Sequence, residues 1–396
     1  MNFKISQLGT RMQAFGLDGV IINNPINIRY LTGLQAEGYL LINENENVFV
    51  TDSRYIEEVN SKLTIDDEII SQDGKNLNQD DFLNFFVGAD KVGFEEKYVT
   101  YEKYQKLLVK YRPKELIEAD RMLENMREIK SEDEINKIEK ACNITDNCFL
   151  HILDYIEVGM TEKQIALEIY NFFMKNGAEG LAFDTIVASG ENSSIPHAIP
   201  TDRKIKIGDP VLIDFGAKFD GYCADMTRTF FIKEVSDEDR NLYELVQKVQ
   251  GKAFEKMKNG ANGSEIAKFV KNEFYLHDYD LLHALGHGVG MEVHEKPILS
   301  PNISTTLQEN MIVTNEPGIY IPGKIGIRIE DTILINNVTA TELTKSNKNL
   351  LVVWFKYKVL YFKIVGNNNN KVYESLKNSN TLWKGLTLWM KKSALI

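Results

Sequence analysis

The second half of the sequence places carboxylates where a strand would ordinarily run into apolar or turn-forming residues. These carboxylates are Asp214, Asp225, Glu316 and Glu330. An acid that is buried without a partner costs several kcal/mol or shifts its pKa, so such positions favour a bound cation. Together with one neutral histidine, the set balances two divalent cations and leaves room for one bridging hydroxide. Paired cations about 3.5–4 Å apart lower the pKa of bridging water and polarise a carbonyl, which predicts a dinuclear metallohydrolase.

The same residues have simpler explanations when they are taken singly. Asp214 before Phe-Gly could form a turn, Asp225 could pair with Arg228 at the surface, and Glu316-Pro-Gly is a plausible β-turn. The glycines at 286–290 lack the preceding apolar strand and the Gly-Lys-Ser/Thr ending of a phosphate loop. No His-Glu-x-x-His is present, which excludes a mononuclear zincin. Mixed carboxylate and imidazole ligation suits Mn, Co, Zn or Fe without choosing among them.

The elements around these carboxylates indicate an α+β domain of roughly 220–230 residues, within the usual domain range. Capping boxes at Ser131-x-x-Glu134 and Thr161-x-x-Gln164 open two helices, because each pair can satisfy free N–H groups of a first turn. Strands punctuated by glycine are expected at 184–190, 210–232 and 311–335. Alternation places Thr227 on the face of Asp225, and Arg328 on the face of Glu330.

Composition divides the chain into three predicted parts. Residues 1–127 alternate short apolar runs with helical stretches, which is typical of an α/β domain, and the catalytic candidates lie in 128–353. Residues 354–396 carry eight Lys, one acid and all three Trp of the chain, and we expect them to form an extension of unknown role. Within it, 367–370 reads as a flexible break and 371–392 as a basic amphipathic helix that could contact an anionic membrane or nucleic acid. We prefer a dispensable extension without a catalytic role.

The overall composition argues against several classes of protein. The 46 basic and 57 acidic residues give a net charge of −11, which argues against a general nucleic-acid binder. No run of eighteen uncharged apolar residues is present to span a membrane, and the N-terminus lacks the apolar core of a signal peptide. Three irregularly spaced Cys fit a reduced, cytoplasmic chain.

Several motifs recur in an order typical of one known family. The N-terminal part contains Asn-Pro-x-Asn-x-x-Tyr-Leu-Thr-Gly at 24–33 and Thr-Asp-x-Arg-Tyr at 51–55. The later motifs are FDTIVASG at 183–190, PHAIP around His197, DFG at 214–216, GYCADMTRT at 221–229, HALGHGVGMEVHE at 283–295, NEPGIY at 315–320 and RIED at 328–331. Up to about residue 353, the chain resembles the Xaa-Pro peptidases, aminopeptidase P and prolidase, of the pita-bread metallopeptidase superfamily.

The resemblance implies a smaller creatinase-type N-terminal α/β domain followed along the chain by a pita-bread catalytic domain. It also implies a homodimer that forms through the N-terminal domain. It also implies two divalent metal ions, with Mn favoured over Co, Zn or Fe. Asp214 would bind one ion, Asp225 and Glu330 would bridge both, and His287 and Glu316 would complete the other ion's shell.

The remaining site residues also take their roles from the resemblance. His197 and His294 match positions that contact the substrate or handle protons, and His283 lines the same cleft. Arg328 would orient Glu330 and nearby groups, and Thr227 would support the ligands. Glu316 would accept the proton beside the bridging hydroxide that attacks the carbonyl, and a histidine would protonate the proline nitrogen as it leaves.

The expected reaction is therefore hydrolysis of the bond between an N-terminal residue and proline. The segment 183–203 resembles short bacterial aminopeptidase P chains, which favours an aminopeptidase acting on longer peptides, and a dipeptidase with the same ligand set is the alternative. A creatinase-like amidinohydrolase without metal and a peptidase-dead binding module are more remote, because the ligand set is complete.

Overall fold

The computed structural model describes residues 3–62, 68–71, 85–356, 359–364 and 371–376. The chain divides into two compact units, Met1–Arg127 and Glu128–Ile396. Within the described residues, no helix is both long and apolar enough to cross a membrane. The expected division into three parts, 1–127, 128–353 and 354–396, stays a prediction.

The first unit is an α/β domain built on one mixed sheet of six strands in the order β4-β3-β2-β1-β5-β6. Its strands are β1 (Gly19–Ile22), β2 (Tyr39–Asn43), β3 (Asn47–Thr51), β4 (Glu68–Ser71), β5 (Lys91–Phe94) and β6 (Glu115–Glu118). Its helices are α1 (Phe3–Phe15), α2 (Pro25–Thr32), α3 (Ile56–Lys62), α5 (Tyr101–Tyr111) and α6 (Asp120–Glu128), the last of which ends in the second unit. Burial of apolar side chains such as Ile21, Leu41 and Val92 forms its core.

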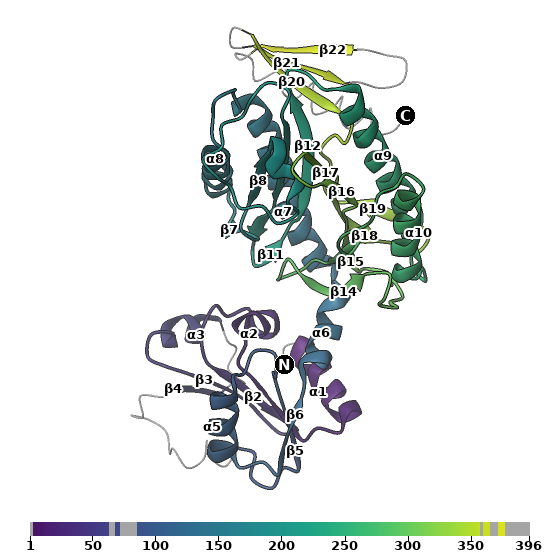
Figure 1. Cartoon of the computed structure of the whole chain (residues 1–396). Helices are drawn as coiled ribbons and strands as arrows, with labels where there is room; N and C mark the ends of the chain where they lie inside the picture. Colours follow the sequence, from purple (N-terminus) through teal and green to yellow (C-terminus); the bar gives the residue numbers. More distant parts are fainter. Residues whose placement is uncertain (1–2, 63–67, 72–84, 357–358, 365–370, 377–396) are drawn as a thin grey trace. The chain divides into compact units, whose positions relative to one another are not determined.

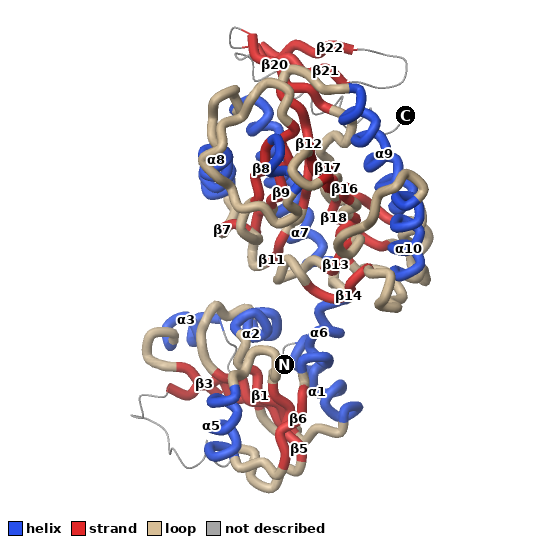
Figure 2. The backbone as a smooth tube through the Cα atoms, viewed as in Figure 1, coloured by secondary structure: helices blue, strands red, loops and turns tan. Residues whose placement is uncertain are grey.

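The second unit has two α/β halves. The first half contains α7 (Glu132–Tyr155), α8 (Glu162–Lys175), β7 (Gly180–Leu181), β8 (Ile186–Ser189), the 3-10 turn η1 (Gly190–Ser194), β9 (Pro210–Phe215), β10 (Ala217–Phe219), β11 (Tyr222–Cys223) and β12 (Met226–Ile232). The second half contains α9 (Asp237–Phe254), α10 (Gly263–Tyr275), β13 (Gly286–Gly288), β14 (Glu295–Leu299), β15 (Ile312–Asn315), β16 (Gly318–Ile321), β17 (Ile325–Arg328), β18 (Asp331–Ile335) and β19 (Ala340–Glu342). Figures 1 and 2 show α8 and α10 on opposite sides of the strands of this unit. The arrangement confirms the predicted α+β class.

Local signals explain where the first two helices of this unit begin. The Ser131 hydroxyl accepts from the Glu134 N–H while the Glu134 carboxylate accepts from the Ser131 N–H, and Thr161 and Gln164 form the same reciprocal pair. Both predicted capping boxes are thus present. The helices then bury an apolar stripe, with Phe149 among the residues that pack against β9 and β12.

Two larger sheets carry the candidate site residues. One has the order β22-β21-β20-β12-β9-β8 and the other β14-β13-β15-β18-β19. They meet where the Glu330 N–H donates to the Thr227 carbonyl over 3.1 Å. There the hydroxyl of Thr332 donates to the Asp225 carbonyl over 2.7 Å, and the Asp225 N–H donates to that hydroxyl. The backbone before β12 is therefore fixed to β18.

The sheet continues past residue 353 through β20 (Leu351–Lys356), β21 (Val359–Ile364) and β22 (Lys371–Leu376). β20 pairs in parallel with β12, so the predicted boundary at 353/354 falls inside a strand. The helix predicted for 371–392 is wrong for 371–376, because the free edge of β21 offers backbone partners that override the amphipathic pattern. The predicted break at 367–370 and residues 377–392 lie outside the described residues.

Candidate metal centre

Asp214 and Asp225 come from neighbouring antiparallel strands of one sheet. Asp214 is next to last in β9 and lies opposite Thr227, whereas Asp225 stands directly before β12. Glu316 and Glu330 come from the other sheet: Glu316 follows β15, Glu330 precedes β18, and these two strands are antiparallel neighbours. The two halves of the unit each contribute a pair of acids to the place where they meet.

His287 lies in the middle of β13, between two glycines. A Cβ atom on Gly286 would stand 2.1 Å from the Thr314 carbonyl oxygen, and one on Gly288 would stand 2.1 Å from that of Lys296. Glycine at both positions therefore lets the neighbouring strands approach closely on either side of the imidazole. The ring Nδ1 donates to the Gly288 carbonyl over 3.2 Å, so Nε2 is the nitrogen that faces the acids.

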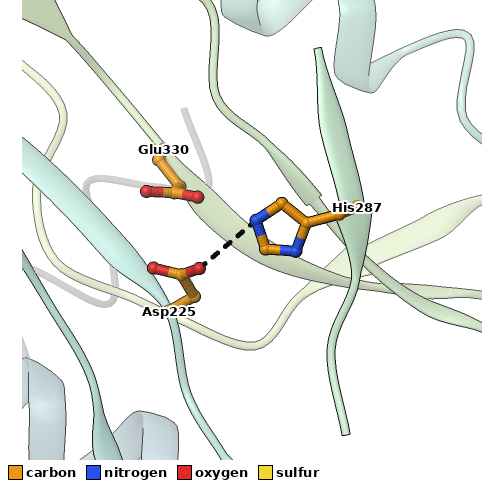
Figure 3. Close-up of side chains that lie close together, drawn as sticks. All are labelled: Asp225, His287 and Glu330. Atoms are coloured by element: carbon orange, nitrogen blue, oxygen red, sulfur yellow. Dashed lines mark ion pairs between the residues drawn. The ribbon is translucent and has the colours of Figure 1, made fainter. Parts of the chain in front are cut away.

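Three of the predicted ligands stand together closely enough to hold one ion. One ligand atom each from Asp225, His287 and Glu330 lies within 4.8 Å of the others, and all three residues are buried. Figure 3 shows the two carboxylates on one side and the imidazole facing them. His287 Nε2 lies 3.6 Å from Asp225 Oδ2 and 3.3 Å from Glu316 Oε1, so the fourth predicted ligand adjoins the cluster. Such a meeting of acceptors suits a proton or a cation between them.

The charges of these groups oppose one another strongly. Burial raises the pKa of Asp225 well above its usual range, and repulsion from Glu330 and Asp214 adds to the rise. Burial also raises the pKa of Glu330 well above its usual range, with repulsion from Glu316 and Asp214. Burial acts in the same direction on Glu316, but the hydrogen bond and charge of His287 outweigh it and hold this pKa at about 2.

Unsatisfied oxygens support the fit of a cation. Within the described part of the chain, Asp214 Oδ1 and Asp225 Oδ1 are buried without a hydrogen-bond partner. Buried carboxylate oxygens are normally paired, because leaving them unpaired carries a desolvation penalty. Oxygen-rich ligation with one imidazole nitrogen is a donor set that divalent ions accept. The residues present therefore fit divalent metal ions.

Arg328 is the buried cation beside this cluster. Its Nη2 donates to Asp214 Oδ2 over 2.5 Å, and its Nε donates to the Thr227 hydroxyl over 2.9 Å. The Thr227 hydroxyl in turn donates to Glu330 Oε2 over 2.6 Å. Arg328 thus contacts Asp214 directly and acts on Glu330 through Thr227, whereas the sequence indicated Glu330 first.

Two of the three histidines predicted to act on substrate, His294 and His283, lie beside the proposed ligands. The His294 ring lies 4.3 Å from the His287 ring, centroid to centroid. His283 Nδ1 donates to the Ala284 carbonyl over 2.8 Å, and this nitrogen stands 3.7 Å from Glu316 Oε2. Burial lowers the pKa of both His283 and His294, and the Glu316 carboxylate partly opposes this effect. His197 is exposed and interacts electrostatically with both rings.

Tyr320 is a residue of this network that sequence reasoning did not single out. Its hydroxyl accepts from Arg328 Nη1 over 2.6 Å and lies 3.0 Å from His283 Nε2. Burial raises the pKa of Tyr320 to about 12, so the phenol stays protonated and can donate to His283. The signal was within the quoted NEPGIY motif: Gly318 pairs with Arg328, and Tyr320 follows two residues later on the same strand face.

Comparisons with known proteins agree on the family that they indicate. Residues 136–337 match the pattern described as Metallopeptidase family M24, and residues 4–129 match the Creatinase/Prolidase N-terminal domain. An Xaa-Pro dipeptidase of Pyrococcus horikoshii is 36% identical over 357 residues, which cover 89% of this chain and 99% of that protein.

Solved structures extend the agreement to three dimensions. An Xaa-Pro dipeptidase from Bacillus anthracis superposes with a TM-score of 0.83 at 35% identity, covering 88% of this chain and 99% of that one. An X-Pro aminopeptidase from Thermotoga maritima has a TM-score of 0.79 at 34% identity, covering 87% and 100%. The buried cluster of acids around His287 and these similarities lead to one conclusion: the chain belongs to metallopeptidase family M24, carries the creatinase/prolidase N-terminal domain, and is a hydrolase of the kind that the resemblance to the Xaa-Pro peptidases implied.

Proposed function

We propose that this metallopeptidase hydrolyses the bond between an N-terminal residue and a following proline. The observation that carries the proposal is the buried cluster of Asp225, His287 and Glu330 in a chain whose similar proteins are named for Xaa-Pro hydrolysis. The names of those proteins support specificity for proline in the substrate, and the cluster supports a hydrolytic metal centre.

The proposed metal ligands are Asp214, Asp225, His287, Glu316 and Glu330. They would hold two divalent ions, of which Mn²⁺ is the one that the family resemblance favours. Their support is the short spacing of three of them, the two unpaired carboxylate oxygens and the mixed donor set. Divalent ions here would lower the pKa of bound water and polarise the scissile carbonyl.

The chain's own residues then divide the remaining work. Glu316 lies beside the cluster, with Oε1 3.3 Å from His287 Nε2, and its carboxylate would accept a proton there. His294 has a lowered pKa, so its neutral ring can donate an N–H to the oxygen that gains charge as the carbonyl is attacked. His197, which is exposed and interacts electrostatically with His294 and His283, would protonate the proline nitrogen, which leaves poorly until it is protonated.

Asp214 needs a fixed orientation if it is to serve as a ligand. The hydrogen bond from Arg328 to Oδ2 would fix this orientation, and the unpaired Oδ1 is then the oxygen that can bind a metal ion. The Tyr320 hydroxyl holds the guanidinium in turn, and it links Arg328 to His283. We therefore assign Arg328, Thr227 and Tyr320 to orienting the groups that touch metal or substrate.

Two substrate lengths are candidates. The sequence of 183–203 favours an aminopeptidase, and one similar solved structure bears that name. Other similar proteins are named dipeptidases, which favours the free dipeptide. Steady-state kinetics on Ala-Pro and Ala-Pro-Ala, with metal-loaded protein, test both: a higher kcat/KM on the tripeptide supports the aminopeptidase, and the reverse supports the dipeptidase. Activity on neither peptide would contradict the proposed function.

The homodimer through the N-terminal domain and the cytoplasmic location rest on the resemblance and the composition, and they stay predictions. Sedimentation equilibrium of the full chain tests the first. We expect twice the 45.3 kDa mass of one chain.

A further inference from the structure

Glu162 is a completely buried carboxylate on the first turn of α8, and no metal or substrate role accounts for it. Its Oε1 accepts from the N–H and the hydroxyl of Ser189 over 2.7 and 2.8 Å. Its Oε2 accepts from the N–H and the hydroxyl of Thr201 over 2.9 and 2.6 Å. The Asn192 amide donates to both oxygens, over 3.1 and 3.2 Å. One carboxylate therefore binds both ends of the segment 190–200, which we name the His197 loop.

The middle of the His197 loop is fastened to the hairpin β16–β17. The Gly326 N–H donates to the Ser193 hydroxyl over 2.8 Å, and Arg328 Nη1 donates to the Pro196 carbonyl over 3.3 Å. His197 follows Pro196 directly, so its backbone is held between the Arg328 contact and the Glu162 anchor.

The anchor requires an acid because every group that faces it donates. A glutamine amide would turn its NH₂ toward at least two of these donors, whereas a carboxylate accepts from all of them. Arg203 lies beside the anchor: its Nη1 donates to the Ser189 hydroxyl over 2.9 Å and to Asp209 over 2.6 Å. The Ser189 hydroxyl thus accepts from Arg203 while it donates to Glu162. Figure 1 shows α8 next to β8, the strand that ends at Ser189.

We infer that Glu162 is a positioning residue of the peptidase, which sets the place of His197 by closing the His197 loop at its base. The inference rests on the proposed function, in which His197 acts on the substrate. A reacting group displaced by about 1 Å costs on the order of 10²-fold in rate, so an open base would impair catalysis without touching the metal ligands.

The test compares Glu162→Gln with Glu168→Gln in the full metal-loaded chain. Glu168 is on the same helix and pairs with His151 over 2.7 Å, so it matches the substitution without touching the loop. In Glu162→Gln we expect metal content to stay unchanged, amide hydrogen exchange over 189–201 to rise by about tenfold or more, and kcat/KM on the better of the two proline peptides to fall by about 10–100-fold. The Glu168→Gln protein should stay within about twofold of the parent in all three.

A double variant separates positioning from general destabilisation. If Glu162 acts through His197, Glu162→Gln combined with His197→Ala should lose at most about twofold more activity than His197→Ala alone. Losses that multiply would overturn the inference. Should Glu162→Gln fail to fold, Thr201→Val removes one donor and leaves the carboxylate, and it should shift exchange and kcat/KM in the same direction by a smaller factor.

The exchange measurement also stands apart from the peptidase assay. If the parent chain cleaves neither proline peptide, the proposed function fails, and exchange still reports on the loop. Unchanged exchange over 189–201 in both Glu162→Gln and Thr201→Val would overturn the anchoring itself.

Discussion

The acids of the candidate centre repel one another in the absence of a cation. Asp225 and Glu330 are buried side by side with raised pKa values, and each lies within reach of further carboxylates. Removing the negative charge of one of them removes a ligand and relieves repulsion at once. A variant that neutralises Asp225 or Glu330 should therefore bind less metal and, without metal, be more stable than the parent.

The first prediction concerns these two acids. Asp225→Asn or Glu330→Gln should lower kcat by roughly 10²–10⁴-fold and reduce the metal bound per chain, because each change removes a proposed bridging ligand. Mass-spectrometric metal analysis and peptide hydrolysis at saturating Mn²⁺ measure both effects. Asp278→Asn, which is exposed and has a positive φ that Asn tolerates, is the matched control and should stay near parent activity. More than a tenth of parent activity in either ligand variant would falsify the bridging assignment.

The second prediction concerns the substrate histidines. His294→Ala and His197→Ala should each keep the parent's metal content and lose most of kcat, because neither is among the proposed ligands. A lowered melting temperature with activity retained would mean that the ring merely packs near the site. A His294→Ala protein that no longer bound metal would make His294 a ligand instead.

At the scale of elements, local signals in the sequence predicted more than distant ones. The helices α7 and α8 could be predicted because a capping box and the apolar stripe after it lie within a few residues. Four of the five proposed ligands were recognised because acids in apolar strands are unusual, and the family motifs supplied His287 and the role of each. The Asp214 partner of Arg328 and the role of Tyr320 depend on how β9 meets the hairpin β16–β17, which spacing along one strand does not report.

Residues 371–376 also show that a local sequence pattern does not report tertiary pairing. The basic pattern of 371–376 suited a helix, yet these residues pair with β21 along its length. A strand edge satisfies backbone groups whatever the side-chain period, so tertiary pairing decided the structure there.

The third prediction tests whether that extended sheet matters to the site. A chain ending at Val353 keeps the pairs Phe231–Val352 and Ile232–Val353 but loses β21, β22 and every Trp. It should bind metal and cleave proline peptides within about threefold of the full chain, at a somewhat lower melting temperature, because all proposed site residues precede residue 353. Tyrosine-like fluorescence confirms the truncation. Loss of most of kcat in a folded truncated chain would make the extension part of the active enzyme.

At the scale of the whole molecule, the proposed metal centre lies between two halves of the catalytic unit. Asp214 and Asp225 belong to the sheet under α7 and α8, whereas His287, Glu316 and Glu330 belong to the strands packed against α9 and α10. A cation bound by both sets stabilises their contact. Removing it should therefore lower the melting temperature of the unit as well as its activity.

The fourth prediction gives the pH dependence of that stability. In metal-free protein, Asp225 and Glu330 have raised pKa values, so the folded state binds more protons than the unfolded state and stability falls as pH rises from about 5 to 8. The pKa of His287, which the Glu316 hydrogen bond raises against the opposing effect of burial, acts in the same direction, and Glu316 loses its contribution only well below this range. Metal-loaded protein should show the opposite slope, because protons compete with the ions for the same ligands. Urea unfolding with chelator and with Mn²⁺ across this range measures both slopes; equal slopes would contradict the prediction.

Titration of the metal-free full chain with Mn²⁺, with bound metal and hydrolysis of Ala-Pro and Ala-Pro-Ala followed in the same samples, tests the central claim most directly. The proposed site predicts that hydrolysis of at least one of these peptides rises with occupancy and reaches its plateau at two ions per chain, and that Asp225→Asn abolishes the rise. A plateau at one ion, or full hydrolysis by chelator-treated protein without added metal, would contradict a dinuclear Xaa-Pro peptidase.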